Sequence, residues 1–431
     1  MGKDRKQKLK EIAKEYPPLY TNYFYDDYIK DLLRGDIQFI ENMCAKEPLN
    51  EEQLQEMLTS TDYLAEEKYD GVRADLHFGD KIRCFSRRIS KKTGWYAENT
   101  DNVPHIRDLN YPEELKGTVL DGEFRVLSGD FKDISSLMNC NFDEAILRQK
   151  ENGLKATFIA FDILYYKGIS VMKMPLHRRK DLLADVIRRL PSECDIMQSS
   201  FTDDKMHIYI TKDVIQGLSA SYPTLLKEMS ELKPKPNETP FWMLASKQAW
   251  YEYILVKGGE GLMLKHKDGK YHMKRCREYT KYKKFLTRDV VISGFIEPTR
   301  VYEGKAPETW EYWEGDTPVT KYYAKGWIGT VKYSVLITQE ELEELKKKNP
   351  KEKYDCYYFE GNLYLEIGDC GGMDEQMREY MSNNKPYLIG KVIEVGCNEV
   401  IKKTGKLRHP RFLRIRDDKV NTMCTFKDHL E

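Results

Sequence analysis

The segment from Lys68 to Arg73 (KYDGVR) brings together residue types that suit covalent chemistry on a phosphate. A lysine amine attacks phosphorus only in its neutral form, so a reactive lysine needs partial burial or neighbouring cations that disfavour the ammonium. Gly71 lets the backbone pass close to a ligand, and the planar guanidinium of Arg73 matches phosphate or ribose oxygens. The same residues also fit a β-turn with surface charges. K-x-D-G arises by chance in about one protein in ten of this size, so the motif alone decides little.

Other residues along the chain have matching chemistry. Transfer of a phosphoryl group requires that its negative charge be neutralised, which Lys and Arg can do. Carboxylates suit Mg²⁺, and an aromatic ring gives a nucleobase a stacking face. The candidate cations are Arg73, Arg87, Lys265, Lys281 and Lys283, the candidate carboxylates are Glu123 and Glu260, and the candidate ring is Phe161. Taken singly, each is as well explained as a core aromatic, a surface carboxylate or a solvated strand lysine.

The order of these segments resembles one family, the ATP-dependent DNA ligases of the covalent nucleotidyltransferase superfamily. The matching segments are 68–73 (KYDGVR), 85–87 (FSR), 120–123 (LDGE), 158–162 (FIAFD), 175–179 (PLHRR), 260–265 (EGLMLK), 279–283 (YTKYK), 408–412 (RHPRF) and 416–419 (RDDK). The resemblance covers about residues 63–431, with gaps. Tyr279 stands where the family usually has tryptophan, which matters little if the ring only packs.

The resemblance implies a role for each segment. Lys68 would carry AMP, Glu66 would lie by the adenine, and Phe161 would stack on it. Glu123 and Glu260 would serve ribose and metal. The expected catalytic residues are Lys68, Asp70, Arg73, Lys281, Lys283, Arg416, Asp418 and Lys419. The expected nucleotide-binding residues are Glu66, Lys68, Arg73, Arg87, Glu123, Phe161, Glu260, Lys265, Lys281 and Lys283, and the expected metal ligands are Glu123 and Glu260.

The implied reaction seals 5′-phosphate/3′-hydroxyl nicks in duplex DNA in three steps, through a lysyl-AMP and adenylylated DNA. ATP and Mg²⁺ are the expected cofactors and nicked duplex DNA the expected partner, for a protein acting as a monomer. Two alternatives stay open. One is an mRNA capping guanylyltransferase, which shares K-x-D-G but uses GTP. The other is a nick-binding protein that has lost the chemistry.

Composition limits the remaining classes. The nine cysteines form no C-x-x-C pair, so a zinc site is not expected. The basic N-terminus lacks the apolar stretch of a signal peptide, and no run of about 20 apolar residues predicts a membrane helix. These features predict a cytoplasmic protein, or a viral one acting in the host cell with the nucleus possible, and no membrane partner.

Charge is balanced overall but not locally. Lys plus Arg and Asp plus Glu each number 70, which argues weakly against a nucleic-acid partner. Basic residues nevertheless dominate two runs, 265–284 and 402–419. Such runs are often simply solvated faces, but these two coincide with the motifs.

Hydrophobic patterning predicts an α+β protein. Ala74, Leu76 and Phe78 alternate with Asp75 and His77, the period-2 pattern of a half-buried strand. Other predicted strands are 82–85, 117–127, 156–166, 290–295, 327–337, 354–367 and 388–395, and predicted helices are 175–190, one ending at Gly258-Gly259, and 339–348.

We therefore expect three parts. Residues 1–62 form a short N-terminal helical extension, with no room before the first motif for a large DNA-binding domain. Residues 63–285 form a nucleotidyltransferase (adenylation) domain of antiparallel sheets flanked by helices. Residues 286–431 form an OB-fold β-barrel domain. Insertions relative to the family are expected near 195–245 and 299–325.

Overall fold

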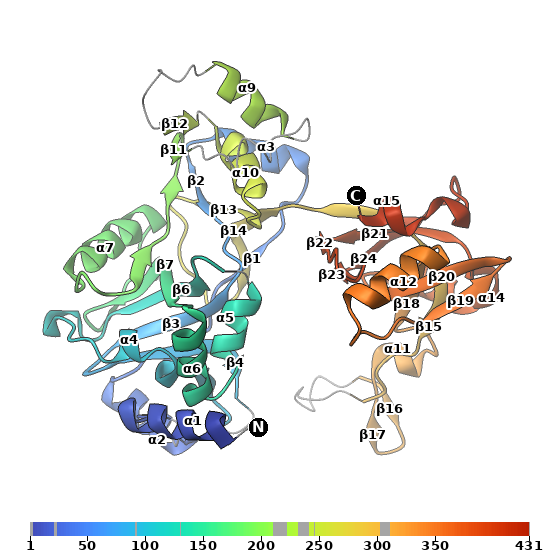
Figure 1. Ribbon diagram of the computed structural model, residues 1–431. Coiled ribbons are helices and arrows are strands. Elements are labelled where there is room, and N and C mark those ends of the chain that lie inside the picture. Colours follow the sequence, from blue (N-terminus) through green and yellow to red (C-terminus); the bar gives the residue numbers. More distant parts are fainter. Residues whose placement is uncertain are drawn as a thin grey trace. The chain divides into compact units, whose positions relative to one another are not determined.

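The computed structural model divides the chain into two compact units, Met1–Lys283 (unit 1) and Lys284–Glu431 (unit 2) (Figure 1). The residues it describes are 3–20, 24–90, 93–129, 131–209, 222–231, 241–244, 246–301 and 311–430. Much of the insertion expected at 195–245, and residues 302–310 of the second, lie outside them. In the described part of the chain, no helix is long and apolar enough to cross a membrane.

Unit 1 is built on two main sheets. Its strands are β1 (Cys44–Lys46), β2 (Tyr63–Glu67), β3 (Val72–Phe78), β4 (Ile82–Ile89), β5 (Tyr96–Glu98), β6 (Val119–Val126), β7 (Ala156–Tyr166), β8 (Ile169–Ser170), β9 (Ile196–Gln198), β10 (Phe201–Thr202), β11 (Met206–Tyr209), β12 (Phe241–Leu244), β13 (Gly261–His266) and β14 (Arg275–Lys283). Its helices are α1 (Lys3–Glu15), α2 (Tyr25–Arg34), α3 (Glu51–Thr59), α4 (Pro104–Arg107), α5 (Phe131–Met138), α6 (Phe142–Asn152), α7 (Leu176–Arg189), α9 (Pro223–Glu231) and α10 (Lys247–Val256).

The larger sheet has the order β5-β4-β3-β6-β7-β8, with β9 added in parallel to β7. Its apolar positions form the main core of unit 1, to which α5 and α7 contribute Ile134 and Leu183. The alternation in β3 is confirmed, but the strand is buried on both faces. Asp75 and His77 are 4% and 3% exposed. The expectation of a half-buried strand was wrong because the segment preceding β1 covers the polar face.

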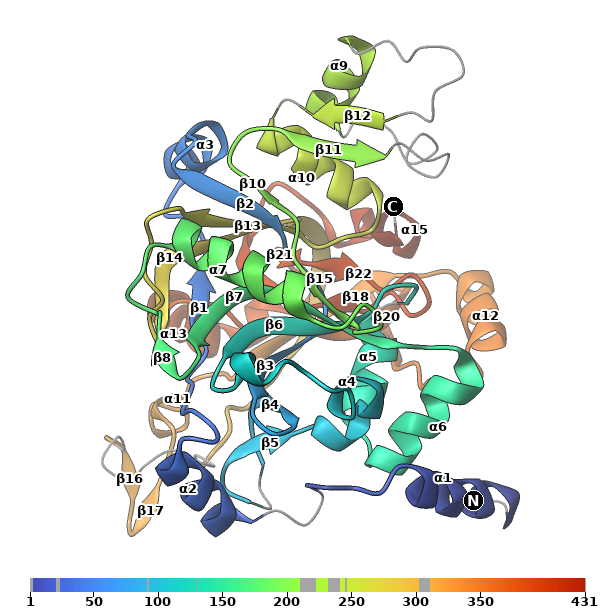
Figure 2. The ribbon, with the colours of Figure 1, turned by 90° about the vertical axis from the view of Figure 1, so that its left-hand side faces the viewer.

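The smaller sheet has the order β1-β14-β13-β2-β10 and packs against α10 and α3 through a second core (Figure 2). Its edge strand β1 runs parallel to β14, which lies about 230 positions later in the sequence. Residues 1–62 are therefore not only a helical extension, because β1 belongs to this sheet. Three residues with no periodicity gave no sequence signal for that pairing. The helices α1 and α6 lie side by side, joined by Ile12, Ile146 and Leu147.

Unit 2 contains a six-stranded antiparallel sheet of order β19-β20-β18-β15-β21-β24. Its strands are β15 (Leu286–Ile296), β16 (Trp313–Glu314), β17 (Thr317–Pro318), β18 (Thr330–Leu336), β19 (Cys356–Phe359), β20 (Asn362–Cys370), β21 (Val392–Cys397), β22 (Glu399–Val400), β23 (Leu407–Arg408) and β24 (Arg411–Ile415). Its helices are α11 (Lys321–Ala324), α12 (Gln339–Lys348), α13 (Glu375–Asn383), α14 (Lys385–Leu388) and α15 (Phe426–Leu430). The predicted strand 354–367 is a hairpin, β19 and β20, turning at Gly361, whose φ is +80°.

Candidate active site

Lys68 lies where the sequence predicted it, in the turn between β2 and β3. Its backbone N–H donates to the carbonyl of Gly261 at 2.8 Å, which fixes the turn against the start of β13. Its Nζ donates to Glu260 Oε2 at 2.5 Å, and both side chains are about one-fifth exposed, at 23% and 21%. The side chain of the motif lysine is therefore held in place by Glu260, from the EGLMLK segment.

Lys68 opens onto a cavity of about 330 Å³ between the two sheets of unit 1. The predicted site residues that line it are Glu66, Lys68, Arg73, Arg87, Glu123, Phe161, Lys265 and Lys281. Sequence reasoning assigned no site role to several other lining residues: Met43, Cys44, Ala45, Glu67, Tyr69, Met263 and Arg275. Tyr279, noted from the sequence only as a replacement for tryptophan, also lines the cavity. Eight motif residues scattered over more than 200 positions thus converge on one cavity.

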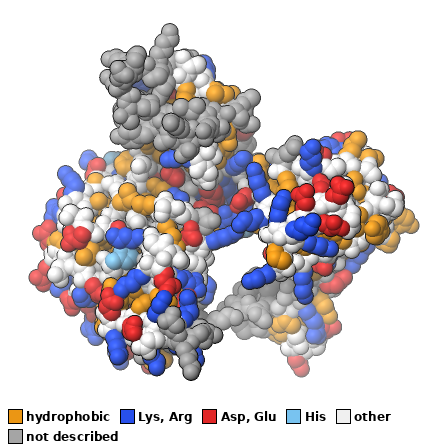
Figure 3. Space-filling model, viewed as in Figure 1, with side chains coloured by type: hydrophobic (Ala, Val, Ile, Leu, Met, Phe, Trp, Pro, Cys, Tyr) orange, Lys and Arg blue, Asp and Glu red, His pale blue; other side chains and the backbone are white. Residues whose placement is uncertain are grey.

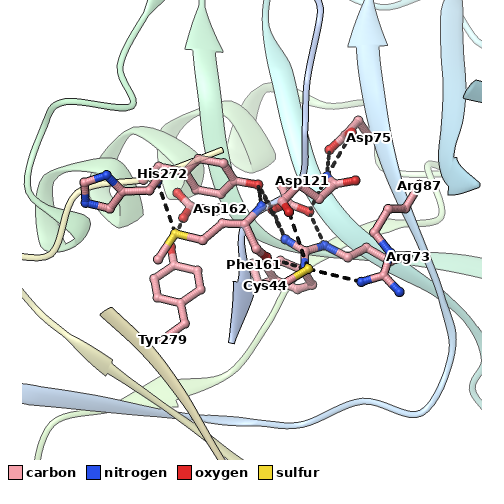
Figure 4. Close-up of polar contacts among 12 residues, drawn as sticks. Cys44, Arg73, Asp75, Arg87, Asp121, Phe161, Asp162, His272 and Tyr279 are labelled. Atoms are coloured by element: carbon pink, nitrogen blue, oxygen red, sulfur yellow. Dashed lines mark hydrogen bonds and ion pairs between the residues drawn. The ribbon is translucent and has the colours of Figure 1, made fainter. Parts of the chain in front are cut away.

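Arg73 is tied into a buried network beside the cavity (Figure 4). Its Nε and Nη2 donate to the two carboxylate oxygens of Asp121 at 2.9 and 2.6 Å, and Nη1 donates to the carbonyl of Met43 at 2.7 Å. Asp121 also accepts from Tyr271 Oη at 2.8 Å. Because its donors already serve the protein, Arg73 is oriented before any ligand arrives.

Asp75 lies opposite Asp121 across β3 and β6. Asn42 Nδ2 donates to both oxygens of Asp75, at 2.8 and 3.0 Å. Burial, reinforced by the nearby Asp121 carboxylate, raises the pKa of Asp75 well above its usual range. Sequence reasoning treated Asp75 as a solvent-side strand residue and did not identify Asp121 as the partner of Arg73.

Glu123 accepts a hydrogen bond from the backbone N–H of Gly71 at 2.7 Å. Burial raises the pKa of Glu123 to about 7, against the opposing effect of the Lys68 cation. A Cβ on Gly71 would lie 2.3 Å from the carbonyl oxygen of Phe124. The glycine is thus required by the approach of its own turn to β6, whereas the sequence suggested the approach of a ligand.

The Glu66 carboxylate is 1% exposed and surrounded by donors. Lys265 Nζ and Ser199 Oγ donate to its Oε2 at 3.0 and 3.1 Å, and Lys180 Nζ forms an ion pair with its Oε1. Burial opposes ionisation, but the two lysines outweigh it and hold the pKa of Glu66 below its usual value. Lys180, one residue after the PLHRR segment, was not identified from the sequence.

Phe161 is half-buried and flanked by two cations. Lys265 Nζ lies 4.7 Å and Arg73 Cζ lies 5.3 Å from the centroid of its ring. Lys265 Nζ also lies 4.6 Å from the centroid of Tyr279. Such contacts hold cations over the ring faces. The ring remains on the cavity wall, as a stacking platform requires.

Tyr279 does more than pack. Its hydroxyl donates to Asp162 Oδ2 and accepts from Arg179 Nη2 at 3.1 Å. Arg179, which is fully buried, also holds Asp162 Oδ1 through Nε at 2.8 Å. The sequence expectation that the tyrosine-for-tryptophan difference matters little applied only to a ring that merely packs, and that condition is not met, because the hydroxyl joins a buried ionic network linking β7, α7 and β14.

The other site residues predicted in unit 1 are Arg87, Lys281, Lys283 and Asp70. Arg87 is exposed and donates to Cys44 Sγ at 3.3 Å, and Lys281 forms an ion pair with Glu47 at 3.3 Å. Burial and the nearby Lys281 and Lys68 cations lower the pKa of Lys283 below its usual value. Asp70 is half-buried in the turn that carries Lys68, and neither Asp70 nor Lys283 lines the cavity.

The last motif lies in unit 2 and has its own ion-pair cluster. Arg416 donates from Nε and Nη2 to the two oxygens of Asp418, both at 2.8 Å. Its Nη1 donates to Asp289 Oδ1 at 3.0 Å, and Lys419 Nζ donates to Asp289 Oδ2 at 2.5 Å. Asp289, on β15, was not singled out from the sequence. It holds the two motif cations beside each other.

Two carboxylates near Lys68, those of Glu123 and Glu260, are the candidate ligands for a divalent cation. Among the described residues, no group of three or more His, Cys, Asp and Glu side chains could hold a metal ion. Two carboxylates still fit Mg²⁺, which commonly keeps several waters and takes further oxygens from substrate phosphates.

Comparison with known proteins adds the decisive observation. Residues 43–216 match the model of the ATP dependent DNA ligase domain, beginning one residue before β1. Over these residues the chain is similar to the ATP-dependent DNA ligase family, and two relatives named as DNA ligases match it over 82% of its length. The range 43–216 contains Lys68, Arg87, Glu123 and Phe161. It begins just before β1, the edge strand of the smaller sheet of unit 1.

The matches to individual relatives cover only part of each relative's length. DNA ligase 4 of Saccharomyces cerevisiae is 29% identical over 192 residues, 42% of this chain and 20% of that protein. DNA ligase 2 of Methanosarcina mazei is 24% identical over 370 residues, 82% of this chain and 51% of that protein. Among solved structures, a Lig E DNA ligase is 18% identical, covering 88% of this chain and all of that one, with a TM-score of 0.46. The chain spans about half or less of these two curated relatives.

Proposed function

We propose that this chain seals 5′-phosphate/3′-hydroxyl nicks in duplex DNA, using ATP and a lysyl-AMP on Lys68. The observation that carries the proposal is the cavity in unit 1, where Lys68 meets the cations Arg73, Arg87, Lys265 and Lys281, the carboxylate Glu123 and the ring of Phe161. Cations neutralise phosphate charge, and a ring beside a buried carboxylate and ammonium suits a nucleobase.

The proposed chemistry is a chain of phosphoryl transfers. The neutral amine of Lys68 bonds through Nζ to the α-phosphorus of ATP and gives up a proton to water, the bond from that phosphorus to the oxygen bridging to the β-phosphate breaks, and pyrophosphate leaves. A 5′-phosphate oxygen of the nick then attacks that phosphorus and breaks its bond to Nζ. Finally the 3′-hydroxyl attacks the 5′-phosphate, AMP leaves, and the hydroxyl proton passes to a base or to water.

Three arrangements of this chain bear on the first step. Lys68 is presented by a turn fixed to both Gly261 and Glu123, so the reacting nitrogen is positioned before ATP binds. The Glu260 carboxylate must release Lys68 Nζ before that nitrogen can react. Glu123 and Glu260 would hold Mg²⁺, which would supply neutralisation of the phosphate charge.

For unit 2 we propose an OB-fold domain whose residues Arg416, Asp418 and Lys419 serve the first step. Support for the fold comes from the antiparallel order of its sheet and from register shifts in β15, β18 and β21, because bulges bend strands as a small barrel requires. The domain division we propose is a nucleotidyltransferase domain to about residue 285, now including β1, followed by this domain. A monomer suffices for the chemistry, because one chain supplies every proposed residue.

The test incubates the protein and Lys68→Ala with Mg²⁺ and ATP or GTP labelled at the α-phosphate, after treatment with pyrophosphate to remove bound AMP. We expect label on the wild-type protein from ATP only, and sealing of a nicked duplex with a 5′-phosphate. Label from GTP would instead indicate a capping guanylyltransferase. Binding of nicked DNA without any label would indicate a nick-binding protein.

A further inference from the structure

A buried lysine stands behind the wall of the cavity. Lys180, in the second turn of α7, is 2% exposed and does not line the cavity. Its Nζ forms the ion pair with Glu66 Oε1 on β2, donates to the carbonyl of Phe161 on β7 at 2.7 Å, and reaches Ser199 Oγ at 3.5 Å. One ammonium thus joins the carboxylate and the aromatic residue that both face the ligand space.

The surroundings of Glu66 indicate what this ammonium does. Its Oε2 is occupied by the two donors Lys265 and Ser199. Its Oε1 has the ion pair with Lys180 but accepts no hydrogen bond of normal geometry from the described residues. A carboxylate oxygen can accept from more than one donor, so Oε1 keeps acceptor capacity while Lys180 holds it charged and in place.

Adenine presents a donor, its exocyclic amino group, next to the acceptor N1. A cavity wall that presents a carboxylate next to an ammonium complements that pattern, provided that both groups stay fixed. Lys265 is fixed by Glu66 and by the rings of Phe161 and Tyr279. Glu66 in turn depends on Lys180, because removal of one partner from a buried ion pair leaves an uncompensated charge that rearranges or takes up a proton.

We propose that Lys180 is a positioning residue for base recognition: it holds Glu66 as an ionised acceptor for the exocyclic amino group of an adenine stacked on Phe161. The inference rests on the proposed use of ATP and adds the residue that sets selectivity for the base. It predicts that the loss of Lys180 impairs recognition of the amino group more than the phosphoryl transfer itself.

The experiment compares the full-length wild type with Lys180→Met, and with Lys247→Met as the matched control. Lys247 is equally buried, at 2% exposed, but among the described residues its Nζ donates to the backbone carbonyls of Met57 and Ser60, which do not line the cavity. The readout is the rate of AMP-type label transfer to Lys68 from ATP and from purine riboside triphosphate, which lacks the exocyclic amino group, each over a range of concentrations.

We expect the wild type to prefer ATP over the analogue in kcat/KM by about tenfold or more, because a buried acceptor left unpaired penalises the analogue. In Lys180→Met the KM for ATP should rise about tenfold, the preference should fall to about threefold or less, and kcat at saturation should change by less than about threefold. Lys247→Met should retain the wild-type preference.

An unchanged preference in Lys180→Met, or equal losses with both nucleotides, would overturn the inference and assign Lys180 a purely structural role. If Lys180→Met fails to fold by circular dichroism, Lys180→Gln carries the same test, since it keeps a donor for Phe161 but loses the charge. A wild type that forms no covalent adduct from ATP would contradict the proposed function itself, and that outcome is read from the wild type alone.

Discussion

At the scale of single residues, buried polar groups in unit 1 are held by specific partners, and Tyr279 is a clear case. Tyr279→Phe removes one hydroxyl from the network of Asp162 and Arg179, both fully buried. We expect it to lower the free energy of unfolding by about 1–3 kcal/mol, the cost of leaving buried polar atoms unsatisfied. Urea titration measures this, with the half-exposed Tyr25→Phe as the control. Equal midpoints for the two variants would contradict the expectation.

His77 gives a residue-scale prediction about pH. Burial, aided by the Arg83 cation, lowers the pKa of His77 to about 3, and its Nδ1 accepts from the backbone N–H of Gln38 at 3.2 Å. The unfolded chain, with a histidine pKa near 6.5, therefore binds more protons between these values. This contribution to stability is complete above about pH 6.5 and is lost as pH falls, by up to about 1.4 kcal/mol per pH unit.

His77→Gln should remove this dependence. Between pH 6.5 and 5, the unfolding free energy of the wild type should fall more steeply than that of His77→Gln, by about 1–2 kcal/mol in total. Denaturant titrations at pH 5, 6 and 7 measure the difference in slope. Parallel pH profiles for the two proteins would mean that His77 is protonated in the folded state.

Only some residues of the site could be predicted from the sequence. Glu66, Lys68, Phe161 and Lys265, which line the cavity, could be singled out from the sequence because they belong to or flank motifs of fixed spacing. Residues that act through tertiary contacts have no such signal, and Asp121, Lys180 and the Met43 carbonyl became visible only when strands distant in sequence came together. Asp75 was misjudged because alternation indicates two faces of a strand but not what covers the polar one.

At the scale of elements, the turn between β2 and β3 depends on glycine. A Cβ at Gly71 would meet the Phe124 carbonyl at 2.3 Å, so Gly71→Ala should push the turn away from β6 and displace Lys68. We expect a loss of about 1–3 kcal/mol in stability and a reduction of about tenfold or more in lysine adenylylation. Gly79→Ala, in the next hairpin, is the control, because its nearest neighbour lies at an ordinary 3.5 Å. Similar adenylylation rates for the two variants would show that the turn tolerates the methyl group.

The helix α1 offers a prediction away from the site. It docks on α6 through Ile12, which is 4% exposed, and through the ion pairs Lys8–Glu151 and Lys150–Glu15. Ile12→Ala removes most of the buried apolar contact, at a cost of about 2–4 kcal/mol for this docking. Limited proteolysis should then cleave between α1 and α2 faster than in the wild type, while nick sealing stays unchanged. Lys6→Ala, at an exposed position of the same helix, should leave the cleavage rate as it was.

Element prediction from sequence succeeded where periodicity was strong and local. The helix predicted at 339–348 is α12 to the residue, since Thr338 and Glu341 form a capping box at its start. The helix α13 was not predicted, although the side chain of Asp374 caps its start by accepting from the backbone N–H of Met377. The predicted strand 388–395 is shifted, since α14 occupies its first position and β21 begins at Val392.

At the scale of the whole molecule, the totals of basic and acidic residues are equal, 70 of each. On the face shown in Figure 3, each unit carries both signs of charge, with Lys and Arg side chains grouped in places. In the run 402–419, Lys406, Arg408, Arg414, Arg416 and Lys419 form ion pairs within the protein. With a net charge of zero, the proposed binding of DNA would depend on local contacts to phosphates rather than on long-range attraction.

If the protein binds DNA through local phosphate contacts, its Kd for nicked duplex should depend on the salt concentration. Neutralising two or three phosphates would give a log–log slope of roughly −2 to −3, so the Kd for nicked duplex should rise about tenfold or more between 50 and 200 mM KCl. Fluorescence anisotropy across that range measures the slope. Arg87→Ala should make it shallower by about one if this exposed arginine contacts a phosphate. A Kd independent of salt would exclude a phosphate-based interface.

The pairing of β1 with β14 also sets a condition on how the protein is made. The sheet that carries Lys265 and Lys281 is closed at one edge by residues 44–46, which must wait for a strand ending at Lys283. A nascent chain therefore cannot complete this cavity until the residues up to Lys283 have been translated and have cleared the ribosome. Until then residues 44–46 lack the strand with which they pair, and unpaired strands invite association with other chains. Rapid synthesis through the middle of the sequence would shorten that interval.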